Sequence, residues 1–394
     1  MSELRRIFEN GTLTVFFEGQ IDSANSVAAG AALDAAVAEY SPSRLVIDCE
    51  KLRYISSSGL RIILKARKAI PDTSVVSVQP DVYEIFEMTG FTEMMEIKKG
   101  YRVISVEGCE VIGRGANGEV YRTDPETIVK VYLNPDSLPE INRERELART
   151  AFVRGIPTAI PYDVVRIKEG GYGSVFELLN AKSFAQLLKA GEKSVEELAS
   201  LSVDLLKLIH STEVPADAVP DMKRTALGWA QFLADYLPGK TAEKLCALIE
   251  AVPDDNHLMH GDYHIKNIML QNGECLLIDM DTLCHGNPVF EFASIYNAYL
   301  GYCELDHSVT GKFLGVPYET GEKLWKLTLE GYFGTKDAAR LEEIERKAAI
   351  IGHARIMRRS IRRGGLDDAS GRALIEAKKM HIIELAEIID NLEF

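Results

Sequence analysis

The chain has 394 residues, of which 46% are hydrophobic and 26% are charged, and its formal net charge is −14. This length exceeds what one ordinary hydrophobic core supports, so two or three packing units are expected. The negative net charge argues against a nucleic-acid partner, because binding to phosphates requires positive charge. It favours either cationic partners or a role in solubility alone, and the second interpretation is preferred.

No apolar run reaches the roughly 18 residues of a membrane span, and the N-terminal residues lack the apolar stretch and cleavage site of a secretory signal. The six cysteines are scattered without a C-x-x-C pair, which argues against a disulfide framework and a structural zinc site. We therefore expect a cytoplasmic protein with reduced thiols and no membrane partner.

The first region, residues 1–100, alternates between strand-like and helical patterns. Strands are expected at 13–21, 44–49 and 74–79, and helices at 26–40, 56–70 and 81–91. This alternation predicts an α/β domain with a mixed sheet. The second helix opens with serines, which are favoured N-cap residues because their hydroxyls accept hydrogen bonds from free backbone N–H groups.

The second region, residues 101–394, is built differently. It is expected to contain β-rich stretches at 110–133 and 161–179, a helix at 138–153, and mainly helices from 183 onward, interrupted at 259–282. This order predicts an α+β, two-lobed unit. Its smaller β-rich lobe covers about 105–180, and its larger helical lobe covers about 181–394.

Three closely spaced glycines, Gly113, Gly115 and Gly118, form a G-x-G-x-x-G motif. A dinucleotide-binding turn needs a helix directly after the glycines, whereas the residues that follow alternate like two strands. The motif therefore favours a hairpin whose backbone N–H groups approach nucleotide phosphates, with an ordinary glycine-rich turn as the alternative.

Lys130 lies in the apolar strand-like segment IVKVY, so its ammonium group either points out of a half-buried strand or is aimed into a cleft. A Lys–Glu pair holds such an ammonium on the phosphates of ATP in kinases. The next helix offers two glutamates. We select Glu146, which directly precedes an apolar run, and keep Glu144 as the second choice.

The segment HGDYHIKN contains Asp262 and Asn267. Asp279 directly follows the apolar residues LLI in the segment LLIDMD. A general base has to accept the proton of a hydroxyl, and oxygen ligands have to hold a metal nearby. Each of these residues alone is more often a cap or a turn residue. Their order and spacing together indicate catalysis, with Asp262 as the base and Asn267 and Asp279 as metal ligands.

HGDYHIKN and IDMDTLCHGNPVFEFA resemble the catalytic loop and metal strand of aminoglycoside phosphotransferases and choline kinases. The resemblance covers about 105–300 and implies a protein-kinase-like fold that uses ATP and Mg²⁺. It also implies that the hinge Phe176–Leu179 contacts adenine through its backbone, with Phe176 and Leu178 in the ATP site. Glu291 stands where the family commonly has aspartate, and we expect it to brace the catalytic loop.

A protein kinase needs a long peptide-docking segment after its metal-binding aspartate, with D-F-G and A-P-E signatures. Only eight residues separate Asp279 from Pro288, and neither signature is present. We therefore expect a small-molecule hydroxyl acceptor, bound by the helical lobe between ring-like or acidic walls. The alternatives are a regulatory kinase that acts on a protein serine and a non-catalytic ATP-binding scaffold.

The helical segment 345–365 carries five arginines, which are Arg355, Arg358, Arg359, Arg362 and Arg363. They suit an anion or a protein partner, or they face solvent and acidic neighbours on an amphipathic helix. The second interpretation is preferred.

The segments GQID and RLVIDCEKLRYISSSGLRIILKA resemble a STAS domain, the fold of anti-sigma-factor antagonists. In that family the serine at the position of Ser57 accepts phosphate from a partner kinase, so the resemblance implies a protein partner and a phosphorylation site. Negative charge at a helix N-terminus is favourable. Ser56 stands where regulatory members often have aspartate, and the serines also suit an ordinary N-cap, which is the preferred interpretation.

Overall fold

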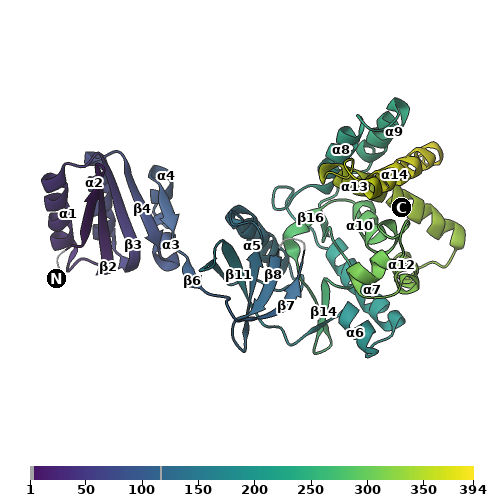
Figure 1. Ribbon diagram of the computed structural model, residues 1–394, viewed down its shortest axis with the longest axis horizontal. Helices are drawn as coiled ribbons and strands as arrows, with labels where there is room; N and C mark the ends of the chain where they lie inside the picture. The colour runs from purple at the N-terminus through teal and green to yellow at the C-terminus, as the bar shows by residue number, and fades with distance from the viewer. Residues whose placement is uncertain (1–3, 116–117) are drawn as a thin grey trace. The chain divides into compact units, whose positions relative to one another are not determined.

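The computed structural model describes residues 4–115 and 118–394, which form two compact units (Figure 1). The first unit contains the chain up to Glu107 together with Val164–Gly170. The second contains Gly108–Asp163 and Gly171–Phe394. Within the described residues, no helix combines the length and the apolar character that crossing a membrane requires.

The first unit is an α/β domain with a five-stranded sheet of order β1-β2-β3-β4-β5. Its strands are β1 (Arg6–Glu9), β2 (Thr12–Ile21), β3 (Arg44–Ile55), β4 (Thr73–Val78) and β5 (Ile97–Lys99), and its helices are α1 (Ser26–Tyr40), α2 (Ser57–Ala69), α3 (Pro80–Met88) and α4 (Phe91–Met94). β1 pairs antiparallel with β2, whereas the other neighbours pair parallel. The sheet is therefore mixed, which confirms the predicted fold class.

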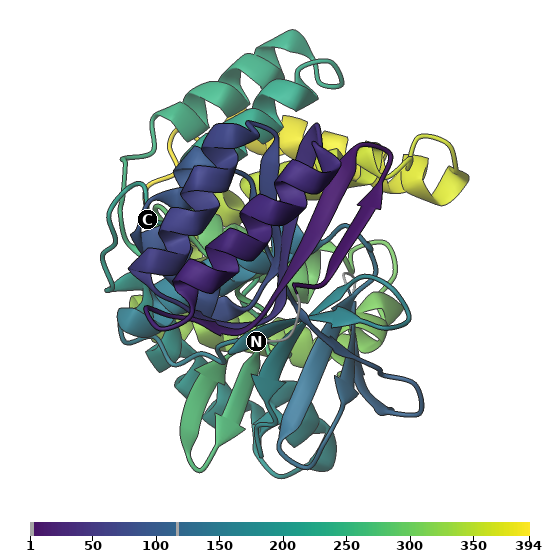
Figure 2. The same cartoon turned by 90° about the vertical axis from the view of Figure 1, so that its left-hand side faces the viewer.

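The helices α1 and α2 lie side by side on the sheet of this unit (Figure 2). Leu13, Val15 and Phe17 alternate along β2 and are buried beneath them. Ser56 caps α2 as predicted, because its hydroxyl accepts a hydrogen bond from the N–H of Gly59 at 3.4 Å. Gly59 itself is required by packing: a Cβ at this position would lie 2.6 Å from Cγ1 of Ile55.

A second sheet has six strands in the order β6-β10-β11-β9-β8-β7. They are β6 (Arg102–Ile104), β7 (Glu110–Arg114), β8 (Gly118–Arg122), β9 (Thr127–Tyr132), β10 (Asp163–Ile167) and β11 (Tyr172–Glu177). β6 pairs parallel with β10. Three neighbouring pairs are antiparallel: β7 with β8, β8 with β9, and β9 with β11. The helix α5 (Leu138–Val153) follows β9 along the chain.

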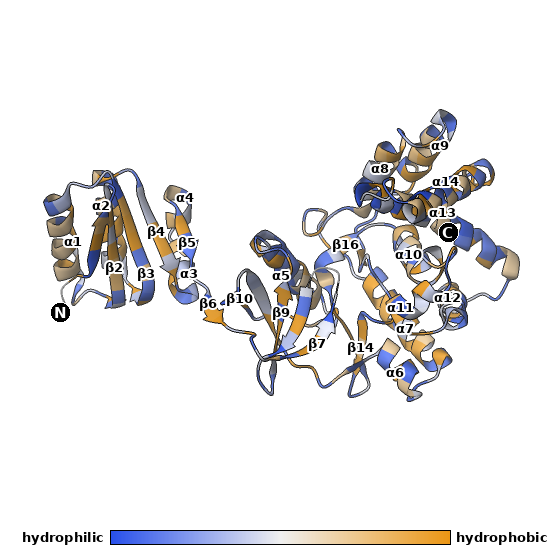
Figure 3. Ribbon diagram, in the orientation of Figure 1, coloured by the Kyte–Doolittle hydropathy of each residue, from blue (hydrophilic) through white to orange (hydrophobic). Residues whose placement is uncertain are grey.

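The rest of the second unit is mainly helical. Its helices are α6 (Phe184–Ala190), α7 (Val195–His210), α8 (Met222–Leu233), α9 (Gly239–Glu250), α10 (Pro288–Tyr296), α11 (Ser308–Leu314), α12 (Tyr318–Phe333), α13 (Ala338–Arg362) and α14 (Ala369–Ile388). α10 packs on α13, and α13 packs on α14. Apolar residues, orange in Figure 3, concentrate on the strands and on the packed sides of the helices. A β-rich part followed by a helical part agrees with the predicted kinase-like fold.

Short strands frame the two predicted catalytic segments. The HGDYHIKN loop lies between β13 (Leu258–Met259) and β14 (Ile268–Gln271), and Asp279 follows β15 (Glu274–Leu277). β14 pairs antiparallel with β15, and β13 pairs antiparallel with β16 (Cys284–His285). These ladders hold the loop and the metal strand next to each other within one unit.

Candidate active site

Lys130 on β9 is partly buried and faces the helix α5. Its Nζ lies 2.9 Å from Oε1 and 3.1 Å from Oε2 of Glu144, and the hydroxyl of Tyr132 donates to the same carboxylate at 2.5 Å. The predicted pairing with Glu146 is wrong, because Glu146 is exposed on another face of α5. Glu144 lies three residues after the buried Ile141, on the apolar stripe of the helix.

The position of Asp279 connects the Lys130–Glu144 pair to the metal strand. Its Oδ1 lies 2.7 Å from Nζ of Lys130. Burial by itself lowers the pKa of Lys130, but the carboxylates of Asp279 and Glu144 outweigh burial and hold that pKa above its usual value. Lys130 is therefore a fixed cation at neutral pH, which suits a group that neutralises phosphate oxygens.

Replacing Glu144 with alanine is expected to weaken nucleotide binding and to lower turnover, because Lys130 would lose the carboxylate that orients it. The loss should be about 10- to 100-fold in kcat/KM for ATP, the effect of one buried charge-assisted contact. Glu146→Ala, on the same helix, is the matched control and should behave like the wild type. Equal effects of the two substitutions in a steady-state assay would contradict the pairing.

The HGDYHIKN loop is held by its own side chains. Nδ2 of Asn267 donates to the backbone carbonyl of Asp262 at 2.9 Å, and Nε2 of His264 lies 3.5 Å from Oδ2 of Asp262. The Asp262 side chain is nevertheless 43% exposed, so a substrate can reach it. Burial raises its pKa, but the hydrogen bond and charge of His264, with the charge of Arg355, hold the pKa of Asp262 well below its usual range.

Asp279 and Asn267 are the predicted metal ligands, and each carries an oxygen of the kind that a hard cation prefers. Asp279 has a left-handed backbone with φ of 63°, which directs the chain into the 3₁₀ turn η1 (Met280–Thr282). Burial and the negative charge of Asp279 raise the pKa of the neighbouring Asp281 to about 7. Oxygen ligands beside crowded carboxylates form a donor set that a divalent cation would stabilise.

A pocket of about 440 Å³ lies beside the Lys130–Glu144 pair. It is lined by Tyr132, Leu133, Asn134, Ser137, Glu140, Arg143, Glu144 and Asp281. These residues come from the end of β9, from α5 and from the turn after Asp279. The lining does not include Asp262, so the pocket borders the ion pair rather than the predicted base.

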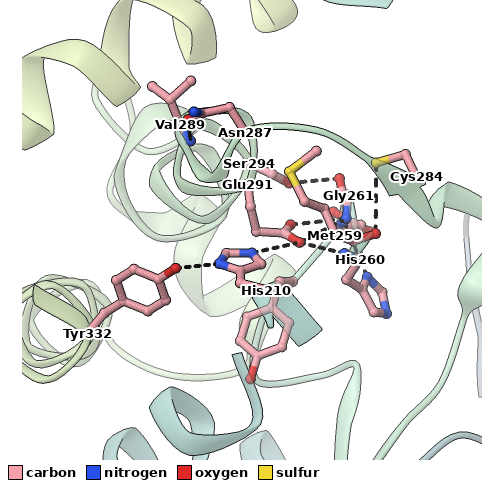
Figure 4. A network of polar contacts seen from close by, with 12 residues as sticks. His210, Met259, His260, Gly261, Cys284, Asn287, Val289, Glu291, Ser294 and Tyr332 are labelled. Carbon is pink, nitrogen blue, oxygen red and sulfur yellow. Dashed lines mark hydrogen bonds and ion pairs between the residues drawn. The ribbon is translucent and has the colours of Figure 1, made fainter. Parts of the chain in front are cut away.

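Glu291 braces the catalytic loop through hydrogen bonds to its backbone, as expected from the sequence (Figure 4). Its fully buried carboxylate accepts a hydrogen bond from the N–H of His260 at 2.5 Å and another from the N–H of Gly261 at 3.0 Å. The hydroxyl of Ser294, one turn later on α10, donates to the carbonyl of Gly261 at 2.9 Å. The start of α10 thus fixes the two residues directly before Asp262.

Sequence analysis missed three side chains that support this loop. Nε2 of His210 on α7 lies 3.9 Å from Oε2 of Glu291, and Nδ1 of His210 lies 2.8 Å from the hydroxyl of Tyr332 (Figure 4). A guanidinium nitrogen of Arg355 on α13 donates to the carbonyl of Gly261 at 2.9 Å. His210 and Tyr332 have no local signal in the sequence, whereas Arg355 stands out as part of the basic helix.

The glycine motif lies on the β7–β8 hairpin, as predicted. The N–H of Gly115 donates to the carbonyl of Gly118 at 2.9 Å, while Ala116 and Asn117 lie outside the described residues. A Cβ on Gly118 would lie 2.3 Å from the carbonyl oxygen of Val131, so packing against β9 requires this glycine. Gly113 lies on β7, opposite Val120.

The predicted adenine hinge, Phe176–Leu179, spans the last two residues of β11 and the two residues after it. Phe176 pairs with Ile128 in the sheet, and the N–H of Leu178 donates to the carbonyl of Glu126 at 2.7 Å. The N–H group of Leu178 is therefore already occupied in this structure. Contact of Leu178 with adenine would have to use its carbonyl group or its side chain.

Two family models match the two parts of the chain. The model described as "Phosphotransferase enzyme family" matches residues 108–315, and the model described as "STAS domain" matches residues 5–103. The first match spans more than half of the chain. The chain therefore belongs to the phosphotransferase enzyme family and carries a STAS domain in its N-terminal part, which confirms both resemblances.

The N-terminal part is similar to a putative anti-sigma factor antagonist, BtrV, of Bordetella bronchiseptica. The two are 33% identical over 92 residues, which covers 22% of this chain and 78% of that protein.

Two solved structures illustrate the fold of the larger part. A mutant of aminoglycoside 2'-phosphotransferase-IIIa in complex with GDP is 13% identical, covers 77% of this chain and 98% of its own, and has a TM-score of 0.50. A thermostable mutant of the aminoglycoside phosphotransferase APH(4)-Ia, in its apo form, is 11% identical, covers 71% and 94%, and also has a TM-score of 0.50. At these identities the likeness concerns the fold alone.

Proposed function

We propose that this protein is an ATP-dependent kinase that transfers the γ-phosphate to a hydroxyl group of a small molecule in the cytoplasm. The observation that carries this proposal is the convergence of Lys130, Glu144 and Asp279 beside the loop of Asp262 and Asn267. Transfer of a phosphoryl group depends mainly on alignment and charge neutralisation, and these residues supply both.

Each group has a distinct role in this proposal. Asp262 orients the acceptor hydroxyl and accepts its proton. Asn267 and Asp279 would hold Mg²⁺, which neutralises phosphate charge when bound. Lys130 and the backbone N–H groups of the glycine hairpin position the phosphates, while Phe176 and Leu178 flank adenine.

The short segment after Asp279 supports a small acceptor. Five of its eight residues belong to the η1 turn and to β16, which pairs with β13 directly before the catalytic loop. A protein kinase uses a longer segment at this point to dock its peptide.

Purified protein incubated with ATP and Mg²⁺ against a panel of hydroxyl-bearing metabolites tests this proposal. We expect ADP release that depends on one acceptor class, together with a product heavier by one phosphate in mass spectrometry. Chelating Mg²⁺ with EDTA should abolish the signal. ATP binding without turnover on any acceptor would instead favour the scaffold alternative.

A second candidate function concerns the STAS domain, which we propose binds a protein partner. Ser57 is exposed in the first turn of α2, where added phosphate would meet free N–H groups. If the kinase unit phosphorylates Ser57, intact-mass analysis after incubation with ATP should show one added phosphate on the wild type and none on Ser57→Ala. An unmodified wild type would rule out self-phosphorylation.

A further inference from the structure

We propose that the acceptor is an anion: a small molecule that carries a phosphate or carboxylate group in addition to its hydroxyl. Its recognition surface is the arginine face of α13, defined by Arg355, Arg358, Arg359 and Arg362. This inference rests on the proposed kinase function, and it names the substrate class.

The four arginines lie on one side of α13 because they are spaced i, i+3, i+4 and i+7. In the part of the chain that the structure describes, none of them forms an ion pair with a carboxylate. The N-terminal half of the same helix differs, since Arg340 pairs with Glu343 at 2.8 Å and Arg346 pairs with Glu342. The expectation that these arginines face solvent holds for Arg359 and Arg362, which are exposed, but the expected acidic neighbours form no ion pair with the arginine face in the described residues.

Aromatic rings orient three of these guanidinium groups without neutralising them. Arg355 lies over Trp229 at 5.6 Å, and Arg358 lies over Phe232 at 6.0 Å; both rings belong to α8. Arg359 lies over the ring of Tyr302 at 5.9 Å and donates to its hydroxyl at 3.1 Å. Cation–π contacts leave the positive charge available to an anion and reduce the entropy that binding would cost.

The arginine face begins at the catalytic loop. Arg355 donates to the carbonyl of Gly261, which directly precedes Asp262, and its positive charge helps to hold the pKa of Asp262 low. Arg359 lies four residues further along α13, about 6 Å at the helical rise. The backbone of Arg359 is thus about one helical turn from that of Arg355, which contacts the residue directly before Asp262.

The helix dipole explains only part of this pattern. Cations are favourable in the last turn of a helix, which accounts for Arg359 and Arg362, since α13 ends at Arg362. Arg355 and Arg358 precede that turn. Burial and the charge of Arg362 lower the pKa of Arg358, so the cluster is self-repelling in a chain whose net charge is −14. A bound anion would relieve this repulsion, whereas a cationic acceptor would increase it.

The first test uses inorganic phosphate as the probe, titrated by calorimetry with ADP and Mg²⁺ saturating the nucleotide site. The variant Arg358→Gln/Arg359→Gln removes two charges and retains most of the side-chain length. Arg340→Gln/Arg346→Gln removes two charges from the same helix and serves as the control. We expect phosphate to bind the wild type and the control alike, and to bind the Arg358/Arg359 variant at least about tenfold more weakly. Equal binding by all three proteins would overturn the inference.

The second test compares acceptors in the ATP-consumption assay. The panel contains sugar phosphates, hydroxycarboxylic acids, neutral sugars and a polycationic aminoglycoside, so that phosphate and carboxylate sources are separated. We expect turnover of an anionic class only, with KM raised at least about tenfold by Arg358→Gln/Arg359→Gln and only partly restored by Arg358→Lys/Arg359→Lys, which keeps the charge but loses the planar guanidinium group. Turnover of neutral or cationic acceptors with an unchanged KM would overturn the inference. Arginine-dependent phosphate binding without turnover of any acceptor would support the anion site and count against the kinase proposal.

Discussion

Replacing Asp262 with asparagine is expected to lower phosphotransfer by roughly a thousandfold while changing ATP affinity little. Asparagine preserves the size of the side chain, and the hydrogen bond from Asn267 uses the backbone carbonyl of residue 262, so the loop should keep its conformation. What is lost is the negative oxygen that orients the hydroxyl and accepts its proton. The nucleotide contacts proposed for Lys130 and Asp279 do not involve this side chain.

Two measurements separate these effects. Product formation under saturating ATP reports catalysis, and calorimetric titration with ADP and Mg²⁺ reports nucleotide binding. Asp254→Asn is a suitable control, because the Asp254 side chain is 90% exposed and pairs with Lys223 on the surface. An Asp262→Asn variant that retains more than about a tenth of the wild-type rate would contradict the assignment of the base.

The pKa of Asp262 adds a pH expectation. Because that pKa lies below its usual range, the carboxylate is already ionised at pH 5 and stays so at higher pH. Protonation of Asp262 should therefore produce no acidic limb in the wild-type rate profile between pH 5 and 8.

The second large effect is expected for Glu291→Gln, which should destabilise the kinase unit by about 3 kcal/mol and abolish most activity. The carboxylate accepts hydrogen bonds from two adjacent backbone N–H groups, those of His260 and Gly261. An amide has only one oxygen, so its NH₂ group would face one of these donors. A donor facing a donor in a fully buried site leaves the N–H of Gly261 with at most the longer contact to the remaining oxygen, 3.3 Å in the wild type, and the loop that carries Asp262 would have to move.

Tryptophan fluorescence during urea unfolding measures the predicted loss of stability. The chain has two tryptophans, Trp229 and Trp325, and both lie in the second unit, so the signal reports on the kinase unit and not on the STAS domain. Glu384→Gln, at a side chain that is 65% exposed on α14, is the control and should leave the midpoint unchanged. An unchanged midpoint for Glu291→Gln would show that the loop does not depend on this brace.

Local patterns in the sequence were sufficient for much of the architecture. Alternating strand and helix signals predicted the mixed sheet of the first unit, since side-chain periodicity reports which face of an element is buried. The spacing of Asp262, Asn267 and Asp279 marked the candidate site, because these residues lie on two segments that the β14–β15 hairpin joins directly. Their catalytic roles remain predictions that the variants above would test.

The structure pairs Lys130 with Glu144 and not with the predicted Glu146, and the helical period of α5 explains why. Two residues correspond to about 200° around a helix, so only one of the two glutamates can face β9. The buried residues Ile141 and Ala148 lie three residues before and four residues after Glu144, which identifies the packed face. The spacing of these buried residues along the helix therefore predicts Glu144 as the partner of Lys130, whereas the apolar run that directly follows Glu146 does not indicate which face of the helix is packed.

The sequence by itself thus determined the two families, the fold class and the short segments that carry the candidate catalytic groups, all of which depend on neighbours close along the chain. Only the tertiary structure decided what surrounds them. Arg355 contacts Gly261 across 94 positions of sequence, and Glu291 reaches His260 across 31. Such contacts depend on how helices pack in space, which periodicity within each helix does not specify. That packing places Arg355 on the residue directly before Asp262, and it is the basis for proposing a basic acceptor site where the sequence suggested ring-like or acidic walls.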